Sequence, residues 1–303
     1  MLQSFLFKIV RFKIFGKSPI NAYLRLNQRV WKHLPPSLTK LHTIYSYGNF
    51  LYTLARLQVR RQALTTFFLR NRPELELIRR LSDQKGKGST LKISVLGCST
   101  GAEVYSILWT IRRARRDLKV IMRAVDISKE ALEFAQRGVY SLKTPGLVSE
   151  PIFERMTEDE MREMFDREEE QAKIKSWIKE GIIWDVGDAR DPSLIDILGG
   201  QDMVVANNFL CHMDPPNAER CLRNIARLVN PGGYLFVSGI DLDIRTKVAR
   251  DLGWKPLQDL MEDIHNADPA LRSNWPSGYA GLEPINKRRL DWKVRYASVF
   301  QIS

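Results

Sequence analysis

The stretch LKISVLGCSTGAEVYS, residues 91–106, predicts the fold of this chain. Its apolar residues up to Leu96 indicate a short buried strand, residues 97–101 a tight loop, and the apolar positions from Ala102 onward one face of a helix. A strand, a glycine loop and a helix in this order form the first half of a βα nucleotide-binding unit. The glycines allow the backbone to pass close to a ligand, and the N–H groups at the start of the helix offer hydrogen-bond donors.

The spacing inside the loop indicates which ligand to expect. Gly97 and Gly101 form a GxxxG pattern, whereas a dinucleotide site requires GxGxxG. Glu103 lies in the first turn of the helix, where a carboxylate would repel a pyrophosphate but suit a cationic ligand. S-adenosyl-L-methionine (SAM) carries both an ammonium and a sulfonium group. Taken alone, the spacing also fits a structural glycine turn followed by a helix-capping acid.

Strands and helices alternate along the rest of the chain. We expect an α/β fold of Rossmann-like type, with a mainly parallel seven-stranded sheet and helices on both faces. Further strands are predicted at residues 120–125, 182–184, 203–206, 234–238 and 294–301.

Polar side chains follow the predicted strands, and in an open parallel sheet the ligand lies across these strand ends. Asp126, after the second strand, is suited to bind both ribose hydroxyls. Asp188, after the third, is suited to the adenine amino group. Asn207 and Asn208, after the fourth, would face the methyl group. Each of these side chains alone also fits a turn residue.

Three motifs resemble those of the chemotaxis receptor methyltransferases, the CheR family. GCSTGAEVYSI (97–107) is similar to their first SAM motif, DMVVANNFLCHMD (202–214) to DxIFCRNVMIYFD, and LTTFFLRN (64–71) to LTxFFR. The resemblance implies a SAM-dependent methyltransferase. The cofactor-binding residues expected from the strand ends and the resemblance together are Thr65, Gly97, Ser99, Thr100, Gly101, Glu103, Asp126, Asp188, Ala189, Asn207 and Asn208.

The chain departs from the family pattern where the family touches the methyl acceptor. The FFR arginine falls on Leu69 without a gap or on Arg70 with a shift of one residue, the CRN arginine is replaced by Asn207, and the IYF tyrosine by His212. We therefore name Arg70, Asn207 and His212 as candidate catalytic residues. Our first choice of acceptor is a protein glutamate carboxylate, and the alternative is a small molecule or lipid. With the alternative acceptor, His212 would act as a general base. His212 also fits a packed structural residue.

The charge of the chain is unevenly distributed. The net charge is +12, and no Asp or Glu precedes Glu74, so that residues 1–73 carry +13 and the remainder −1. We expect a basic helical domain at 1–82, a linker at 83–90 and a SAM-binding domain at 91–303. The block 1–73 predicts contact with an acidic protein surface or an anionic membrane face. Residues 1–17 fit an interfacial amphipathic helix, a transit segment or a packed helix.

Other observations bound the function. The three cysteines lack metal-ligand spacing and a disulfide pattern, so we expect no metal and a reducing, cytoplasmic location, either free or peripheral to a membrane. No segment is long and apolar enough for a bilayer span. A SAM-binding regulator without turnover stays an alternative. A nucleic-acid methyltransferase is suggested by charge alone, and the chain lacks a (D/N)PPY motif at the fourth strand end. Residues 255–290 have no period and suggest a binding loop or a lid.

Overall fold

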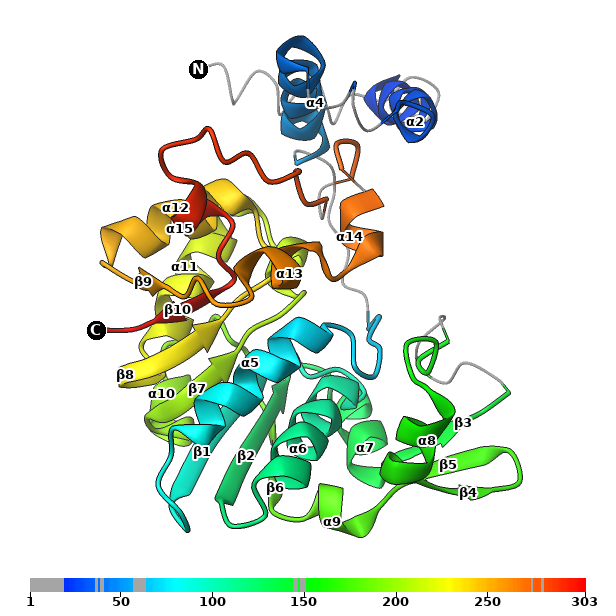
Figure 1. Cartoon of the computed structure of the whole chain (residues 1–303), viewed down its shortest axis with the longest axis vertical. Coiled ribbons are helices and arrows are strands. Elements are labelled where there is room, and N and C mark those ends of the chain that lie inside the picture. The colour runs from blue at the N-terminus through cyan, green and yellow to red at the C-terminus, as the bar shows by residue number, and fades with distance from the viewer. Residues whose placement is uncertain are drawn as a thin grey trace.

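The computed structural model describes residues 19–35, 38, 41–56, 64–143, 147, 151–273, 275–278 and 281–303. Its centre is a seven-stranded sheet of order β6-β2-β1-β7-β8-β10-β9 (Figure 1). All the pairings from β6 to β8 are parallel, and β10 is antiparallel to both of its neighbours. The strands are β1 Thr90–Leu96, β2 Lys119–Asp126, β6 Ile182–Val186, β7 Gln201–Val205, β8 Val229–Phe236, β9 Lys255–Pro256 and β10 Val299–Gln301. The predicted mainly parallel α/β fold is confirmed.

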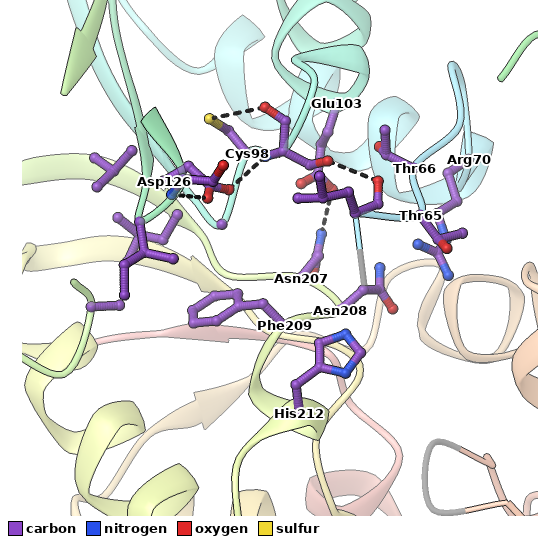
Figure 2. Close-up of a pocket in the computed structure, with 18 of the residues that line it drawn as sticks. Thr65, Thr66, Arg70, Cys98, Glu103, Asp126, Asn207, Asn208, Phe209 and His212 are labelled. Atoms are coloured by element: carbon purple, nitrogen blue, oxygen red, sulfur yellow. Dashed lines mark hydrogen bonds between the residues drawn. The ribbon is translucent and has the colours of Figure 1, made fainter. Parts of the chain in front are cut away.

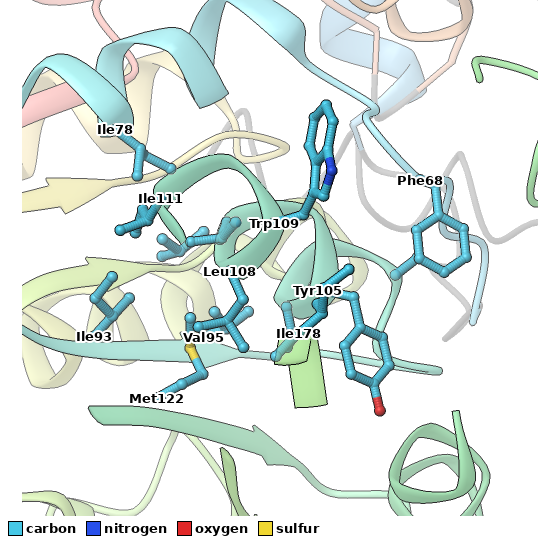
Figure 3. Packing of buried hydrophobic residues seen from close by; sticks show 14 of the residues in the cluster. Phe68, Ile78, Ile93, Val95, Tyr105, Leu108, Trp109, Ile111, Met122 and Ile178 are labelled. Atoms are coloured by element: carbon cyan, nitrogen blue, oxygen red, sulfur yellow. The ribbon is translucent and has the colours of Figure 1, made fainter. Parts of the chain in front are cut away.

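Helices cover both faces of this sheet because its strands are apolar on both sides. One face buries Ile93, Val95 and Met122 against α5, α6, α7 and α9 (Figure 3). The other buries Leu96 and Val204 against α10, α11 and α12. These helices are α5 Arg72–Asp83, α6 Ala102–Ala114, α7 Lys129–Arg137, α9 Ser176–Lys179, α10 Leu194–Leu198, α11 Pro215–Ala226 and α12 Leu242–Asp251.

Local capping explains where two of these helices begin. The Ser128 hydroxyl accepts a hydrogen bond from Ala131 N–H at 3.2 Å and begins α7. Asp214 accepts from Asn217 N–H at 3.0 Å and begins α11, with proline in its first turn. Both helices therefore begin directly after a strand end and its loop.

A small antiparallel sheet of order β3-β5-β4 stands beside the main one. It consists of β3 Val139–Ser141, β4 Phe165–Glu168 and β5 Gln171–Ile174, and α8 Glu158–Met164 lies between β3 and β4 in the chain. A capping box of Thr157 and Glu160 begins α8. The acidic residues 158–170 have the composition of a charged helix face, but after α8 they form the β4–β5 hairpin. Directly after this hairpin, residues 176–179 form α9.

The N-terminal helices α2 Pro19–Lys32 and α4 His42–Ala55 share a small core around Leu24 and Leu51. They contact the rest of the protein through Trp31, whose ring meets that of Trp275 edge-on at 5.1 Å. Arg56 pairs with the buried Asp241 at 3.1 Å. Residues 1–18 lie outside the described part, so the alternatives for 1–17 stay predictions.

Helix α5 lies N-terminal to the predicted domain boundary but packs into the core of the main sheet. Leu77, Ile78 and Leu81 are all buried there. The division at residues 82 and 90 stays a prediction. Helix α5 packs on α6, the helix that follows the glycine loop.

The long stretch 255–290 is built from short elements. These include α13 Met261–Asn266 and α14 Pro269–Ser273, and α15 Trp292–Arg295 follows. The terminal strand predicted at 294–301 is shorter than expected, because residues 292–295 are helical.

Candidate functional site

A cavity of about 490 Å³ lies at the carboxyl ends of β1, β2, β6 and β7. These four strands are neighbours in the sheet, so the residues that follow them meet at one edge. Most of the segment 64–75 also lines the cavity. Figure 2 shows Asp126 on the left of the view and Arg70 on the right, with Glu103 and Asn207 between them.

The glycine loop has a backbone that only small residues accept. Gly97 has a φ of +66°, and a Cβ there would lie 2.8 Å from the Phe209 ring. Gly101 has a φ of +86° and begins α6. Ser99 also has a positive φ, of 51°, which is unusual for a residue with a side chain. Its conformation is fixed by the neighbouring strand end.

The carboxylate of Asp126 fixes the backbone conformation of Ser99. One carboxylate oxygen accepts a hydrogen bond from Ser99 N–H at 2.8 Å, and the other from Ser128 N–H at 2.9 Å. The residue is 7% exposed and lines the cavity. It therefore joins the ends of β1 and β2 and places a carboxylate at the cavity wall.

Glu103 and Asn207 meet at the centre of the cavity. The Asn207 amide donates a hydrogen bond to Glu103 Oε1 at 2.9 Å, and the same nitrogen donates to Glu74 Oε1 at 2.6 Å. The Asn207 oxygen accepts from Ser238 N–H at 3.0 Å, which fixes the orientation of the amide.

Burial changes the acidity of both carboxyl groups. It raises the pKa of Glu103, although the hydrogen bond from Asn207 opposes the shift. It also raises the pKa of Glu74, to about 8, and the charge of Glu103 adds to that rise. Both carboxyl groups therefore hold a proton more tightly than in water, and a cation bound beside them would favour their ionised forms.

The segment before α5 resolves the choice between Leu69 and Arg70. Leu69 is buried, with a φ of 53°, and its N–H donates to the Ser106 hydroxyl at 3.0 Å. Arg70 lines the cavity, and its Nε donates to Asp268 at 2.7 Å. Of these two residues, Arg70 is therefore the one at the cavity. Thr65 also lines the cavity.

Asp188 and Ala189 line the cavity after β6. The carboxylate of Asp188 accepts from the Arg190 guanidinium at 2.6 Å, and this hydrogen bond holds the pKa of Asp188 below its ordinary value. The predicted acceptor for an adenine amino group thus carries an arginine partner, which the sequence reading had not included.

Asn208 and His212 follow β7. Asn208 has a φ of 60°, and its Oδ1 is buried without a hydrogen-bond partner. His212 ends the short 3₁₀ helix Leu210–His212 and lines the cavity (Figure 2). The Asn208 side-chain oxygen can therefore accept a hydrogen bond from a ligand, and the His212 imidazole lines the same cavity.

The structure brings nearly all predicted site residues to this cavity. Thr100 and Gly101 are exceptions, since neither belongs to its lining. Thr100 is fully buried, and its carbonyl accepts a hydrogen bond from the Tyr140 hydroxyl at 2.7 Å. These two residues shape the loop from behind. No residue of 255–290 in the described part lines the cavity, although Asp268 holds Arg70.

Sequence reasoning missed Glu74. The signal was present, because Glu74 is the first acidic residue after 73 residues without one. An acid in the first turn of a helix such as α5 is also an ordinary feature, which hides this signal. Only the packing of α5 on α6 turns its carboxylate into the cavity.

The donor set fits SAM. Glu103 offers a buried carboxylate to an ammonium, Asp126 offers one to ribose hydroxyls, and the glycine loop leaves room for a close backbone approach. A glycine loop with these acids at adjacent ends of a mainly parallel sheet defines the class of SAM-dependent methyltransferases of Rossmann-like fold.

The chain belongs to the CheR methyltransferase family, because the model of the CheR methyltransferase SAM-binding domain matches residues 64–242. Its cofactor is SAM, as predicted from the loop.

Curated relatives agree with this assignment. A 104.1 kDa uncharacterized protein of Rhodobacter capsulatus is 27% identical over 89% of this chain and 26% of its own length. The probable biofilm formation methyltransferase WspC of Pseudomonas aeruginosa is 26% identical over 57% of this chain and 40% of its own. A chemotaxis protein methyltransferase of Vibrio parahaemolyticus is 29% identical over 48% and 52%. The chain thus spans about a quarter to a half of the length of these relatives.

Proposed function

We propose that this protein transfers the methyl group of SAM to an acceptor bound beside His212. The observation that carries the proposal is the gathering of Glu103, Asp126 and Asn207 at one cavity of about 490 Å³. When bound, SAM supplies a methyl group on a sulfonium, which is already a strong leaving group. The protein then has mainly to align the acceptor and exclude water.

Each wall of the cavity has a part in this alignment. Glu103 holds the ammonium and Asp126 the ribose hydroxyls, which together fix the direction of the cofactor. The Arg70 guanidinium is held by Asp268 at 2.7 Å and lies over the Phe67 ring, 5.6 Å from its centroid. This places a fixed positive charge at the acceptor side, where it can orient an anion.

Our first choice of acceptor is a glutamate carboxylate on a protein. A glutamate has an ordinary pKa of about 4.3, so it is ionised near neutral pH and needs no base. Arg70 provides the charge that would orient it. The relative from Vibrio parahaemolyticus is named a chemotaxis protein methyltransferase, which supports the same choice.

A second candidate is a hydroxyl or amine on a small molecule or lipid. It is favoured by Asn207, which stands where the family has an arginine and whose amide nitrogen is shared by two carboxylates. An uncharged acceptor needs a base, and His212 lines the cavity.

Labelled SAM separates these two candidates. The protein is incubated with tritiated SAM and with extracts containing protein, lipid and small molecules. Label on protein that mild base releases as methanol supports the carboxylate. Base-stable label, or label only in the lipid or small-molecule fraction, would overturn the first choice. No transfer with any fraction, while SAM binds, would favour a regulator without turnover.

We also propose that the basic block of residues 1–73 contacts the partner. In its described part, α2 carries Arg25, Arg29 and Lys32 without an acid, and Leu26 and Val30 on its surface are exposed. An acidic protein surface or an anionic membrane face fits this charge. None of the described helices is both long and apolar enough to span a bilayer. A cytoplasmic location stays a prediction.

A further inference from the structure

Glu74 is a buried carboxylate of the cavity wall to which the proposed reaction gives no part. The residue is only 4% exposed. Its Oε1 accepts the hydrogen bond from Asn207 at 2.6 Å, and its Oε2 is buried without a hydrogen-bond partner. Leaving a buried polar atom unpaired is costly, so such an atom in a ligand cavity calls for an explanation.

The arrangement around Asn207 places two carboxylates side by side. Because the Asn207 oxygen is used by Ser238 N–H, the amide nitrogen must face the acids, and it donates to both Glu74 and Glu103. An amide carries no net charge. It can therefore connect two carboxylates but cannot neutralise them.

Arg70, whose positive charge acts on Glu74, donates its hydrogen bond to a different acid. Arg70 donates to Asp268 at 2.7 Å, and Arg155 also reaches Asp268, at 3.2 Å. The Arg70 charge lowers the pKa of Glu74 only slightly compared with the effects of burial and Glu103. In the described part of the chain, Glu74 and Glu103 receive hydrogen bonds from the Asn207 amide but none from a cationic side chain. A cationic ligand would supply the missing positive charge.

We propose that Glu74, acting with Glu103 through the shared Asn207 amide, is a second anionic partner for the positively charged methionine end of the cofactor. In this inference, the pair holds one proton when the cavity is empty. The carboxyl O–H bond breaks when the ammonium enters, and the proton passes to solvent. The pair then bears two negative charges instead of one. This inference rests on the proposed binding of SAM by Glu103.

The acidity of the pair supports this. The pKa of Glu74 is raised to about 8 by burial first and by the charge of Glu103 second. Two close carboxylates titrate as a unit, so the proton belongs to the pair. Besides Glu103 from α6, the titratable or charged groups that line the cavity are Arg70 from the loop before α5, Asp126 after β2, Asp188 and Arg190 after β6, His212 and Asp214 after β7, and Cys98 in the glycine loop. Cys98 is the most deeply buried of these. Burial raises the pKa of its thiol well above the ordinary value, so it stays neutral.

The sign of the pH effect follows. A bound ammonium lowers the pKa of the pair, so the cofactor must displace a proton below pH 8 and displaces none above it. The affinity for SAM should therefore rise by close to tenfold per pH unit between pH 6 and 7.5. In Glu74→Gln this rise should disappear. The amino group of SAM also titrates, near an ordinary α-amino pKa of about 7.7–8.0. This titration is the same with both proteins, so it cancels when the pH dependence of the affinity in Glu74→Gln is subtracted from that in the wild type.

Calorimetric titration at pH 7 in buffers of different ionisation enthalpy measures the proton directly. We expect the wild-type chain to release most of one proton per SAM, and Glu74→Gln to release almost none while still binding SAM, at least tenfold more weakly. Glu76→Gln is the matched control. It lies on the same helix, pairs with Arg79 at 2.7 Å and is absent from the cavity lining. It should behave as wild type.

Two further ligands identify the charge that displaces the proton. S-adenosylhomocysteine keeps the ammonium and should release the same proton. 5′-Methylthioadenosine lacks it and should release none. Equal release with methylthioadenosine, or equal release from wild type and Glu74→Gln, would overturn the inference while leaving SAM binding intact. Failure of the wild-type chain to bind SAM at all would instead overturn the proposed function.

Discussion

Replacing Asp126 with asparagine tests the cofactor cavity at its best-defined contact. The two carboxylate oxygens accept hydrogen bonds from Ser99 N–H at 2.8 Å and Ser128 N–H at 2.9 Å. An amide has the same shape but only one oxygen, so its NH₂ group must face one of these donors. The variant loses one charge-assisted hydrogen bond, and its free energy of unfolding should fall by about 1.5–3 kcal/mol.

The same substitution should weaken SAM binding. A neutral amide accepts weaker hydrogen bonds from ribose hydroxyls than the Asp126 carboxylate does. A loss of about 1.5–3 kcal/mol in binding free energy raises the Kd by about 10- to 150-fold. Calorimetric titration with SAM measures the affinity, and urea unfolding of the ligand-free protein measures the stability.

Adenosine and 2′,3′-dideoxyadenosine distinguish a lost contact from a deformed loop. The wild-type protein should prefer adenosine, and Asp126→Asn should lose most of that preference. Asp185→Asn is a suitable control, because Asp185 lies on the neighbouring strand, pairs with Arg123 at 2.9 Å and does not line the cavity. Wild-type affinity for SAM in Asp126→Asn, or an unchanged preference for the hydroxyls, would refute the assignment of this residue to the ribose.

Three other predictions concern the acceptor, the stability and the partner. For a carboxylate acceptor, His212→Gln should lower turnover less than tenfold and leave the pH–rate profile unchanged; a loss of about 10²-fold or more with disappearance of the limb near pH 6.5 would favour a hydroxyl or amine. Glu283 and Arg295 form an ion pair at 2.6 Å with side chains 3% and 7% exposed, so Glu283→Gln should lower the free energy of unfolding in urea by about 3–5 kcal/mol, and a change below about 1 kcal/mol would contradict this. Removal of residues 1–17 should leave the SAM affinity unchanged and reduce flotation with anionic vesicles; a full chain that ignores such vesicles would point to an acidic protein partner instead.

The position of the cavity was predictable from sequence because parallel strands end at a common edge. Apolar runs located β1, β2, β6 and β7, and the polar residues that follow the carboxyl ends of these strands then had to meet at one edge of the sheet. The order of these strands in the sheet brings Asp126, Asp188 and Asn207 together. No knowledge of side-chain packing was needed for this step.

The parts that sequence reasoning missed depend on contacts between distant elements. Glu74 faces the cavity only because α5 packs on α6, and nothing in residues 72–83 alone specifies that. Leu69 interrupts the motif because a positive φ turns its side chain into the core. The β4–β5 hairpin has too few apolar residues to differ from a charged helix face. It forms because Phe165 joins the aromatic cluster of Phe68 and Tyr140.

The position of β10 has a consequence for the order in which the protein folds. Val299–Gln301 lies between β8 and β9, and its antiparallel pairing with Tyr234–Phe236 covers one edge of β8. During synthesis, β8 leaves the ribosome more than 60 residues before its partner does. Until residue 299 emerges, the nascent sheet has an open edge that is free to pair with other chains. Completion of the sheet, and with it burial of Phe300, must wait until the last strand has been made.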